Sequence, residues 1–149
     1  MRIQKWNENW KFWADKDSFA LVWNVPENAQ TINLPHDAMI EEKAYAESGN
    51  HGNTGFRDGG VYTYVKHLFV GEDAKEKTMM LKFEGIYMNA MVYVNEQLAA
   101  KNMFGYTTFY VPLNDFLRYG QENEIRVQVR NNNMTNSRWY SGTGIYRDV

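Results

Sequence analysis

Near one end of the chain, a short stretch gathers residue types that suit the binding of a sugar. The stretch NSRWYSGTG, residues 136–144, sets Ser137 and Arg138 beside Trp139 and Tyr140. Two neighbouring large aromatic rings are rarely left exposed to solvent, and an arginine is rarely buried in a core. An aromatic face can instead stack on the apolar C–H face of a pyranose. A structural interpretation stays open, in which Trp139 packs under the last strand, Arg138 pairs with a carboxylate, and the two glycines permit a tight turn.

His36 is a candidate general base, because histidine changes its charge near neutral pH. A simpler interpretation is that His36 and Asp37 make local hydrogen bonds that fix the turn after Pro35. Pro35 also keeps Leu34 extended. We therefore expect a structural role for His36.

No metal site is expected. His51 and His67 lie far apart in the sequence and lack a further ligand at the spacing of zinc sites. The carboxylates of Asp15–Asp17 and Gly71–Asp73 could hold calcium, but neither stretch has the alternating oxygen ligands of a dedicated loop, so plain turns are expected. No cofactor is expected either. Asn133 fits a glycosylation motif and is expected to be unmodified.

The composition excludes several classes of partner. The 149 residues carry a formal charge of -2, which gives no electrostatic reason to expect nucleic acid or an anionic membrane. Cysteine is absent, so neither a disulfide nor a thiolate site can form. No apolar run approaches the ~20 residues that span a bilayer. The compartment stays open: periplasmic or extracellular if a signal peptide was removed, otherwise cytoplasmic.

Alternation of apolar and polar residues predicts strands along most of the chain. In NEIRVQVR, the residues Ile125, Val127 and Val129 are expected to face the core. Arg126 and Gln128, like the flanking charged residues, are expected to face water. The same period predicts strands over Phe19–Val25, Thr31–Leu34, Val61–Val70, residues 78–85, residues 88–95, Thr107–Val111 and Gly144–Val149.

Turns rather than long helices separate these strands. The one helical pattern, Pro112–Gly120, is long enough for only one or two turns and ends at a glycine. Eight or so strands without long helices predict an all-β fold, a two-sheet antiparallel β-sandwich. Residues 40–60 interrupt the rhythm. A connection of this length is usually functional, and Asp58 is its best candidate for a pocket residue.

Several motifs, in the same order, resemble glycoside hydrolase family 2, the family of β-galactosidases, β-glucuronidases and β-mannosidases. The resemblance covers Trp10–Val149. Its motifs are NLPHD at residues 33–37, GGVYTYVKHLF at residues 59–69, the run from LKFEG to VQVRN at residues 81–131, and NSRWYSGTGIYRDV at residues 136–149.

The resemblance implies that residues 1–149 are a single N-terminal sugar-binding jelly roll, similar to galactose-binding domains. An immunoglobulin-like domain and a (β/α)8 barrel would follow it, and the barrel would supply both catalytic glutamates. The parent would hydrolyse terminal β-glycosides with retention, and RWYSGTGIYR is closest to the β-galactosidase branch. No catalytic residue is expected in this chain. The Asn-Glu pairs that begin at Asn7, Asn95 and Asn123 are interpreted as surface residues, the last at a solvated edge.

The resemblance also implies roles for the candidate residues. The loop 136–143 would reach the mouth of the barrel, where Arg138 would bind sugar hydroxyls and Trp139 or Tyr140 would stack on the ring. Ser137 aligns near an acidic residue that some members use for a hydroxyl. Asp58 would line the same pocket from the second loop. The expected partner is thus a carbohydrate, bound jointly with the barrel.

Four positions depart from the family's motifs. Tyr62, Thr63 and Val65 stand where the family has glycine, tryptophan and arginine, and Glu96 replaces the glycine of its hairpin. A type I′ turn prefers glycine there because φ is positive, so a different turn type is expected. A free-standing carbohydrate-binding module or lectin is the main rival function. A purely structural sandwich with no sugar role is the other.

Overall fold

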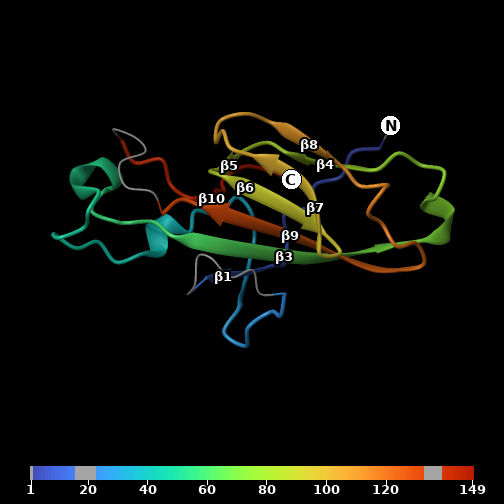
Figure 1. The fold of residues 1–149 in the computed structure, drawn as a ribbon, viewed down its shortest axis with the longest axis horizontal. Coiled ribbons are helices and arrows are strands. Elements are labelled where there is room, and N and C mark those ends of the chain that lie inside the picture. Colours follow the sequence, from blue (N-terminus) through green and yellow to red (C-terminus); the bar gives the residue numbers. More distant parts are fainter. Residues whose placement is uncertain (1, 16–22, 133–138) are drawn as a thin grey trace.

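The computed structural model describes residues 2–15, 23–132 and 139–149. These residues form an all-β, antiparallel sandwich, which confirms the predicted fold class (Figure 1). One layer is a six-stranded sheet with the order β2-β1-β3-β9-β6-β7, and the other consists of the pairs β10-β5 and β4-β8. The expectation of a jelly-roll strand order stays a prediction.

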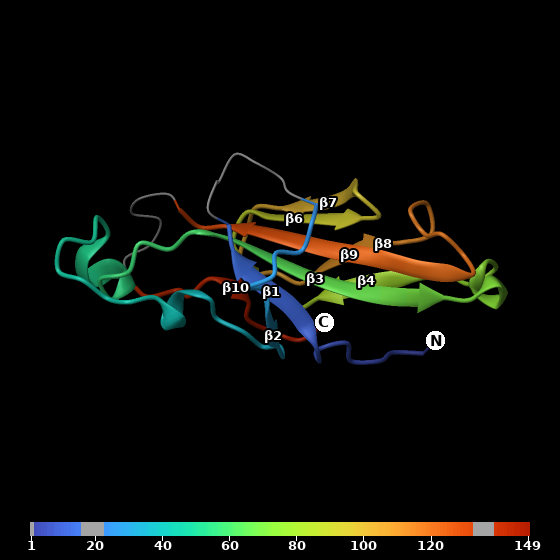
Figure 2. The ribbon, with the colours of Figure 1, turned by 90° about the horizontal axis from the view of Figure 1, so that it is seen from below.

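The two longest strands, β3 and β9, run side by side along the molecule (Figure 2). No helix among the described residues is long and apolar enough to cross a membrane. The strands are β1 (Trp10–Ala14), β2 (Gln30–Ile32), β3 (Val61–Val70), β4 (Met80–Phe83), β5 (Ile86–Tyr87), β6 (Ala90–Val94), β7 (Gln97–Asn102), β8 (Phe109–Pro112), β9 (Gln121–Arg130) and β10 (Gly144–Ile145), and the short 3-10 helices are Met39–Glu41, His51–Thr54 and Glu72–Ala74.

A row of side chains across the large sheet shows how alternation builds the core. Phe12 lies opposite Tyr64, Tyr64 opposite Val127, and Val127 opposite Val92. All four are buried, in one cluster with Phe83 of β4. A period of two places them on the inner face. Each buried side chain of this size contributes about 1.5–3 kcal/mol to folding.

The outer face of β9 is covered, so the prediction that Arg126 and Gln128 face water was wrong. Arg126 is only 1% exposed, and Gln128 is also buried. The Arg126 guanidinium lies 5.4 Å from the ring centroid of Trp13 and 5.3 Å from that of Trp23. It donates hydrogen bonds to Glu124 Oε1 at 2.8 Å and to the carbonyl of Trp23. The prediction considered one strand alone, whereas a distant segment packs over it.

The ends of the predicted elements also differ. The strand expected at Thr31–Leu34 is shorter, and the last one stops at Ile145, beyond which the chain bonds to other segments, as in Glu84 N to Asp148 O at 3.0 Å. Residues 23–25 are irregular, and the rest of Phe19–Val25 lies outside the described residues. The expected helix at residues 112–120 is a turn.

The hairpin between β6 and β7 corrects two further predictions. Both central residues, Asn95 and Glu96, have positive φ, of 49° and 68°, as a type I′ turn requires. Asn95 Nδ2 donates to Phe116 O at 2.8 Å and to Asn123 Oδ1 at 2.7 Å. Asn95 and Asn123 are therefore buried, so the prediction that they are surface residues, with Asn123 at a solvated edge, was wrong. These bonds hold Asn95 in the left-handed conformation that glycine would adopt most easily.

Candidate functional site

Two loops meet at one end of the sandwich, on the left of Figure 1. They are residues 40–60 and the arm of residues 139–143, which returns to β10. A Cβ on Gly55 would lie 3.9 Å from Tyr140 Cδ2, so the loop and the arm are in contact. The structure thus brings Tyr140 to the loop that carries Asp58. Ser137 and Arg138 lie outside the described residues, and their roles stay predictions.

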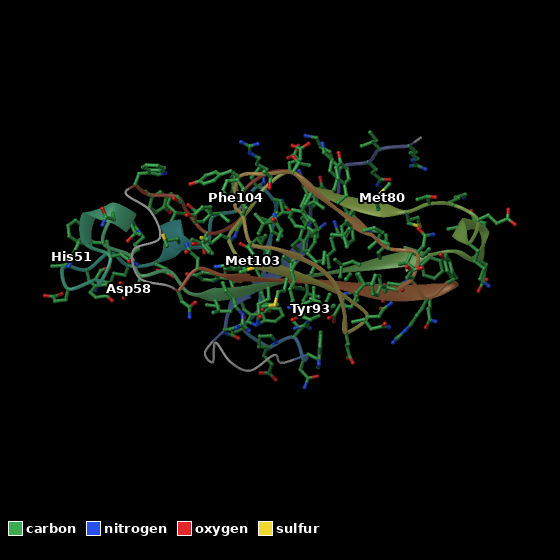
Figure 3. The ribbon with its side chains drawn as sticks, turned by 45° about the horizontal axis from the view of Figure 1, so that its top comes forward. His51, Asp58, Met80, Tyr93, Met103 and Phe104 are labelled. Carbon is green, nitrogen blue, oxygen red and sulfur yellow. The ribbon has the colours of Figure 1, made fainter. Side chains whose placement is uncertain are left out.

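Asp58 organises its own loop. Its Oδ1 accepts hydrogen bonds from Ser48 Oγ at 2.6 Å and Gly49 N at 3.1 Å, and its Oδ2 accepts one from the Tyr45 hydroxyl. The bond from Ser48, followed by that from Tyr45, holds the pKa of Asp58 below its ordinary value. Three of the roughly four lone-pair positions of the carboxylate are therefore occupied by the chain itself. His51 and Asp58 lie together at this end in Figure 3.

Glu42 and Arg57, which the sequence did not single out, stabilise the base of this loop. Glu42 Oε2 accepts from Gly59 N at 3.2 Å, and Oε1 accepts from the Tyr62 hydroxyl. Burial raises the pKa of Glu42 above its ordinary value. Arg57 donates from Nε to Glu42 O at 3.0 Å and from a terminal nitrogen to Gly55 O at 3.1 Å.

The Asp37 cluster, made of Asp37, Met39, Tyr140 and Thr143, joins the arm to the turn after Pro35. Asp37 Oδ1 accepts from Met39 N at 3.0 Å and Thr143 N at 2.8 Å, and Oδ2 accepts from the Tyr140 hydroxyl at 2.6 Å. The bond to Met39 confirms the predicted local role. The other two join segments that lie more than 100 residues apart in the chain.

Gly142 is required where the arm passes Asp37. Its φ is +71°, and a Cβ there would lie 2.8 Å from Asp37 Oδ2. Gly144, with φ of +125°, similarly leaves room for the Tyr64 hydroxyl. The expected backbone freedom of these two glycines is thus confirmed, and it lets the arm close onto Asp37.

His36 makes structural contacts rather than facing solvent. Tyr64 Oη lies 2.8 Å from His36 Nδ1, within hydrogen-bond distance. His36 Nε2 is buried and lies 3.4 Å from Glu41 Oε1. These contacts favour a structural role for His36, but its hydrogen-bond partner lies on β3, so the prediction that His36 bonds locally within the turn was wrong.

Trp139 is 63% exposed, so the interpretation that packs it beneath the last strand was wrong. It neighbours Tyr106, which forms an aromatic cluster with Tyr87 and Phe104. The ring centroids of Tyr87 and Tyr106 are 5.3 Å apart, and those of Tyr106 and Phe104 are 5.6 Å apart. Hydrogen bonds from Ser141 and from Trp139 hold the pKa of Tyr106 below its ordinary value. Sequence reasoning missed Phe104 and Tyr106, although MFGYTTFY is an aromatic run without strand alternation.

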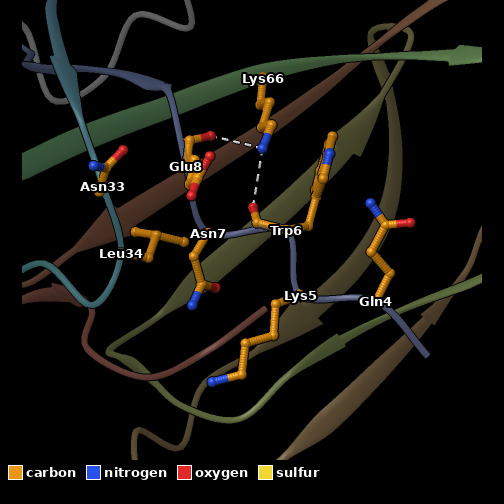
Figure 4. A pocket seen from close by; sticks show the side chains of 8 residues that line it. All are labelled: Gln4, Lys5, Trp6, Asn7, Glu8, Asn33, Leu34 and Lys66. Carbon is orange, nitrogen blue, oxygen red and sulfur yellow. Dashed lines mark hydrogen bonds between the residues drawn. The ribbon is translucent and has the colours of Figure 1, made fainter.

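Two grooves lie away from these loops. One, of about 460 Å³, follows the N-terminal segment, where Lys66 Nζ donates to Trp6 O at 3.2 Å and Glu8 O at 2.6 Å (Figure 4). The ammonium of Lys66 also lies 4.6 Å from the Trp6 ring centroid. The other, of about 420 Å³, borders β1 and includes Asp15 and Glu42. Neither is lined by a predicted sugar contact.

The acidic stretches considered for calcium make other contacts. Asp15 accepts from Trp13 Nε1 at 2.9 Å and from Thr63 Oγ1 at 2.7 Å. Asp73 pairs with Lys77 at 2.7 Å. Among the described residues, no three histidine, cysteine, aspartate or glutamate side chains gather closely enough to hold a metal ion.

Comparison with known proteins gives this arrangement a context. A family model described as glycosyl hydrolase 2 galactose-binding domain-like matches residues 10–143. The chain is 33% identical over 144 residues to a β-galactosidase of Bacteroides ovatus and 26% identical over 153 residues to a β-glucuronidase of Bacteroides fragilis. Each alignment covers 96% of this chain but only 17% and 19%, respectively, of those relatives. The crystal structure of a glycosyl hydrolase family 2 member from Bacteroides cellulosilyticus superposes with a TM-score of 0.88 at 36% identity, covering 97% of this chain and 20% of that one.

Proposed function

The chain belongs to the galactose-binding domain-like family of glycosyl hydrolase 2, and from this premise we propose that it is the non-catalytic, sugar-binding domain of a larger retaining β-galactosidase. The β-galactosidase of Bacteroides ovatus supports the substrate class, and the β-glucuronidase of Bacteroides fragilis is its main competitor. An immunoglobulin-like domain and a (β/α)8 barrel would complete the protein.

The observation that carries the proposal is an arm that is held in place while its indole stays exposed. The Tyr140 hydroxyl is bonded to Asp37, which fixes the backbone beside it. Trp139 belongs to the same arm and is exposed to solvent over most of its surface. An ordered, exposed ring suits stacking on a pyranose, because little conformational entropy is lost on binding. Ser137 and Arg138, which precede the arm in the sequence, would bind the sugar's hydroxyls.

The chemistry itself would lie outside this chain. Retaining hydrolysis needs two carboxyl groups about 5–5.5 Å apart, one protonated as the acid and one charged as the nucleophile. We assign both to the barrel. Residues 139–143 and the loop around Asp58 would orient the substrate and exclude water beside it. The 149-residue chain alone should therefore hydrolyse nothing.

Kinetics of the complete protein with nitrophenyl β-galactoside test this function. Replacing Trp139 by alanine should raise KM about tenfold, equivalent to ~1.4 kcal/mol, with kcat changed less, because a stacking contact binds substrate and transition state alike. The matched control is Phe69→Ala, since Phe69 is equally exposed at the far end of β3. Unchanged KM and kcat in a folded Trp139→Ala enzyme, or turnover by the 149-residue chain, would contradict the proposal.

A free-standing carbohydrate-binding module is the second candidate, favoured by the exposure of Trp139 in this chain on its own. Titration calorimetry of the 149-residue chain with methyl β-galactoside separates the two functions. Binding at micromolar to low-millimolar concentration would support the module. Absence of heat, with a Trp139-dependent KM in the complete protein, would support a pocket shared with the barrel.

A further inference from the structure

Beside the arm lies an exposed aromatic–methionine patch, made of Met103, Phe104 and Tyr106. Met103 is 63% exposed and Phe104 59% exposed. None of the three side chains carries a charge. Large apolar groups that gather on a surface in this way mark a contact with another molecule or domain more often than isolated exposed ones do.

The backbone under the patch is fixed, so the exposure is not that of a loose loop. A Cβ on Gly105 would lie 2.2 Å from Tyr87 Cδ2, so only glycine lets the loop pack on that ring. The Tyr146 hydroxyl donates to Gly105 O at 2.7 Å, and Asn102 Nδ2 donates to Phe104 O at 3.0 Å. The hydrogen bonds to the carbonyls of Phe104 and Gly105 thus fix the backbone, while the Phe104 ring stays exposed.

The shape and chemistry of the patch suit a protein surface better than a sugar. The rings of Phe104 and Tyr106 meet at 69°, which leaves no flat platform for a pyranose. Phenylalanine and methionine lack polar groups for sugar hydroxyls but pack well against irregular apolar surfaces. Polar groups adjoin them, since Asn102 Nδ2 bonds to Phe104 O and Tyr106 Oη lies 3.4 Å from Ser141 Oγ. Apolar residues accompanied by polar ones are common in protein interfaces.

We propose that the catalytic part of the complete protein packs on the aromatic–methionine patch. This proposal rests on the proposed function, in which the complete protein contains a catalytic part. Two observations select it as the occupant. The relatives are about five to six times longer than the matched segment, which supplies a partner in the same polypeptide. The patch is also continuous with the arm, through the 3.4 Å contact between Tyr106 Oη and Ser141 Oγ.

Peroxide oxidation of methionine, read by mass spectrometry, tests the proposal without substrate. Met103 and Met80 are both exposed in the chain alone, at 63% and 56%, and Met80 lies on β4, away from the patch (Figure 3). Both should form sulfoxide at similar rates in the 149-residue chain. In the complete protein Met103 should react about tenfold more slowly than in the chain, because its sulfur would be covered. Equal rates for Met103 in the two proteins would overturn the proposal, as would protection that appears only after methyl β-galactoside is added.

A charge placed in the patch provides the second arm of the test. Phe104→Asp should restore the oxidation of Met103 in the complete protein, whereas Phe69→Asp, an equally exposed site on β3, should not. In the 149-residue chain, both variants should keep Tm within about 2 °C, because neither ring is buried. Restoration by both variants, or by neither, would contradict the proposal. If Met103 is protected in a complete protein that neither binds nor hydrolyses galactosides, the proposed substrate is refuted but the proposed packing surface is still supported.

Discussion

Replacing Tyr140 by phenylalanine should loosen the arm that carries Trp139 while keeping the ring in place. The change removes one hydrogen bond, from the Tyr140 hydroxyl to Asp37 Oδ2 at 2.6 Å. A bond to a charged acceptor contributes about 1.5–3 kcal/mol, and the exposure of Tyr140 lets water replace part of it, so we expect a loss of about 1 kcal/mol. For a domain of this size the corresponding fall in Tm is about 2–4 °C.

Asp37→Ala sets the scale for this effect. It removes all three bonds of the Asp37 cluster and leaves the amides of Met39 and Thr143 without their acceptor. The loss in free energy of unfolding should therefore be about 3 kcal/mol, three times that of Tyr140→Phe. Thermal unfolding at pH 7, followed by circular dichroism, measures both variants. Tyr110→Phe is the control, because Tyr110 is an exposed tyrosine on β8, outside the cluster.

Titration of the tyrosine absorbance gives an independent reading of the same contact. Burial, followed by the hydrogen bond to Asp37, raises the pKa of Tyr140. Asp37→Ala should therefore let Tyr140 ionise at lower pH, while a Tyr140→Phe background removes the signal. If Tyr140→Phe leaves Tm unchanged and Asp37→Ala leaves the titration unchanged, the arm is not held by Asp37, and the structural basis of the proposed function fails.

Three other predictions concern residues away from the arm. Arg126→Ala should lose about 3 kcal/mol in urea unfolding, because it removes a buried cation from between Trp13 and Trp23, and a loss below about 1 kcal/mol would show that this packing contributes little. Glu96→Gly should gain about 0.5–1 kcal/mol in the same assay, because its φ is positive, and any loss would mean that the side chain matters more than the strain. Burial raises the pKa of Glu42 above 4.5, so the folded state binds more protons than the unfolded one and stability falls as pH rises from about 4.5 through the folded pKa. Tm measured between about pH 4 and pH 7 should fall less in Glu42→Gln than in the parent, and parallel curves would contradict this sign.

The regular part of the fold could be predicted because its signal is local. The bounds of β3, Val61–Val70, are those that alternation predicts. The strands predicted over residues 78–85 and 88–95 are also present as β4 and β6, and their alternate residues Leu81, Phe83 and Val92 are buried. A period of two depends only on one face being covered, so it can be seen within a single segment.

Where partners come from distant irregular segments, the sequence offered no comparable signal. Arg126 was misassigned because nothing in the pattern of β9 indicates that Trp23 covers it. In the candidate site, residue type alone selected Asp58 and Tyr140, but their partners Ser48 and Asp37 follow no periodicity. The turn type at Glu96 was predicted wrongly for a related reason. The contacts of the neighbouring Asn95 with distant residues stabilise a backbone conformation that the Glu96 side chain disfavours.

The hydrogen bonds at this end of the sandwich also limit what the site can contribute to sugar recognition. Asp37 and Asp58 each accept three bonds from the chain, so these two carboxylates have little capacity left for hydroxyls. A hydroxyl that competed for Asp58 would displace Ser48 or Tyr45 and loosen the loop. The most exposed side chain of the arm is instead aromatic, that of Trp139. If the domain contacts a galactoside as proposed, it should therefore contribute stacking and shape, and the discrimination between galactoside and glucuronide should come from groups outside the described residues.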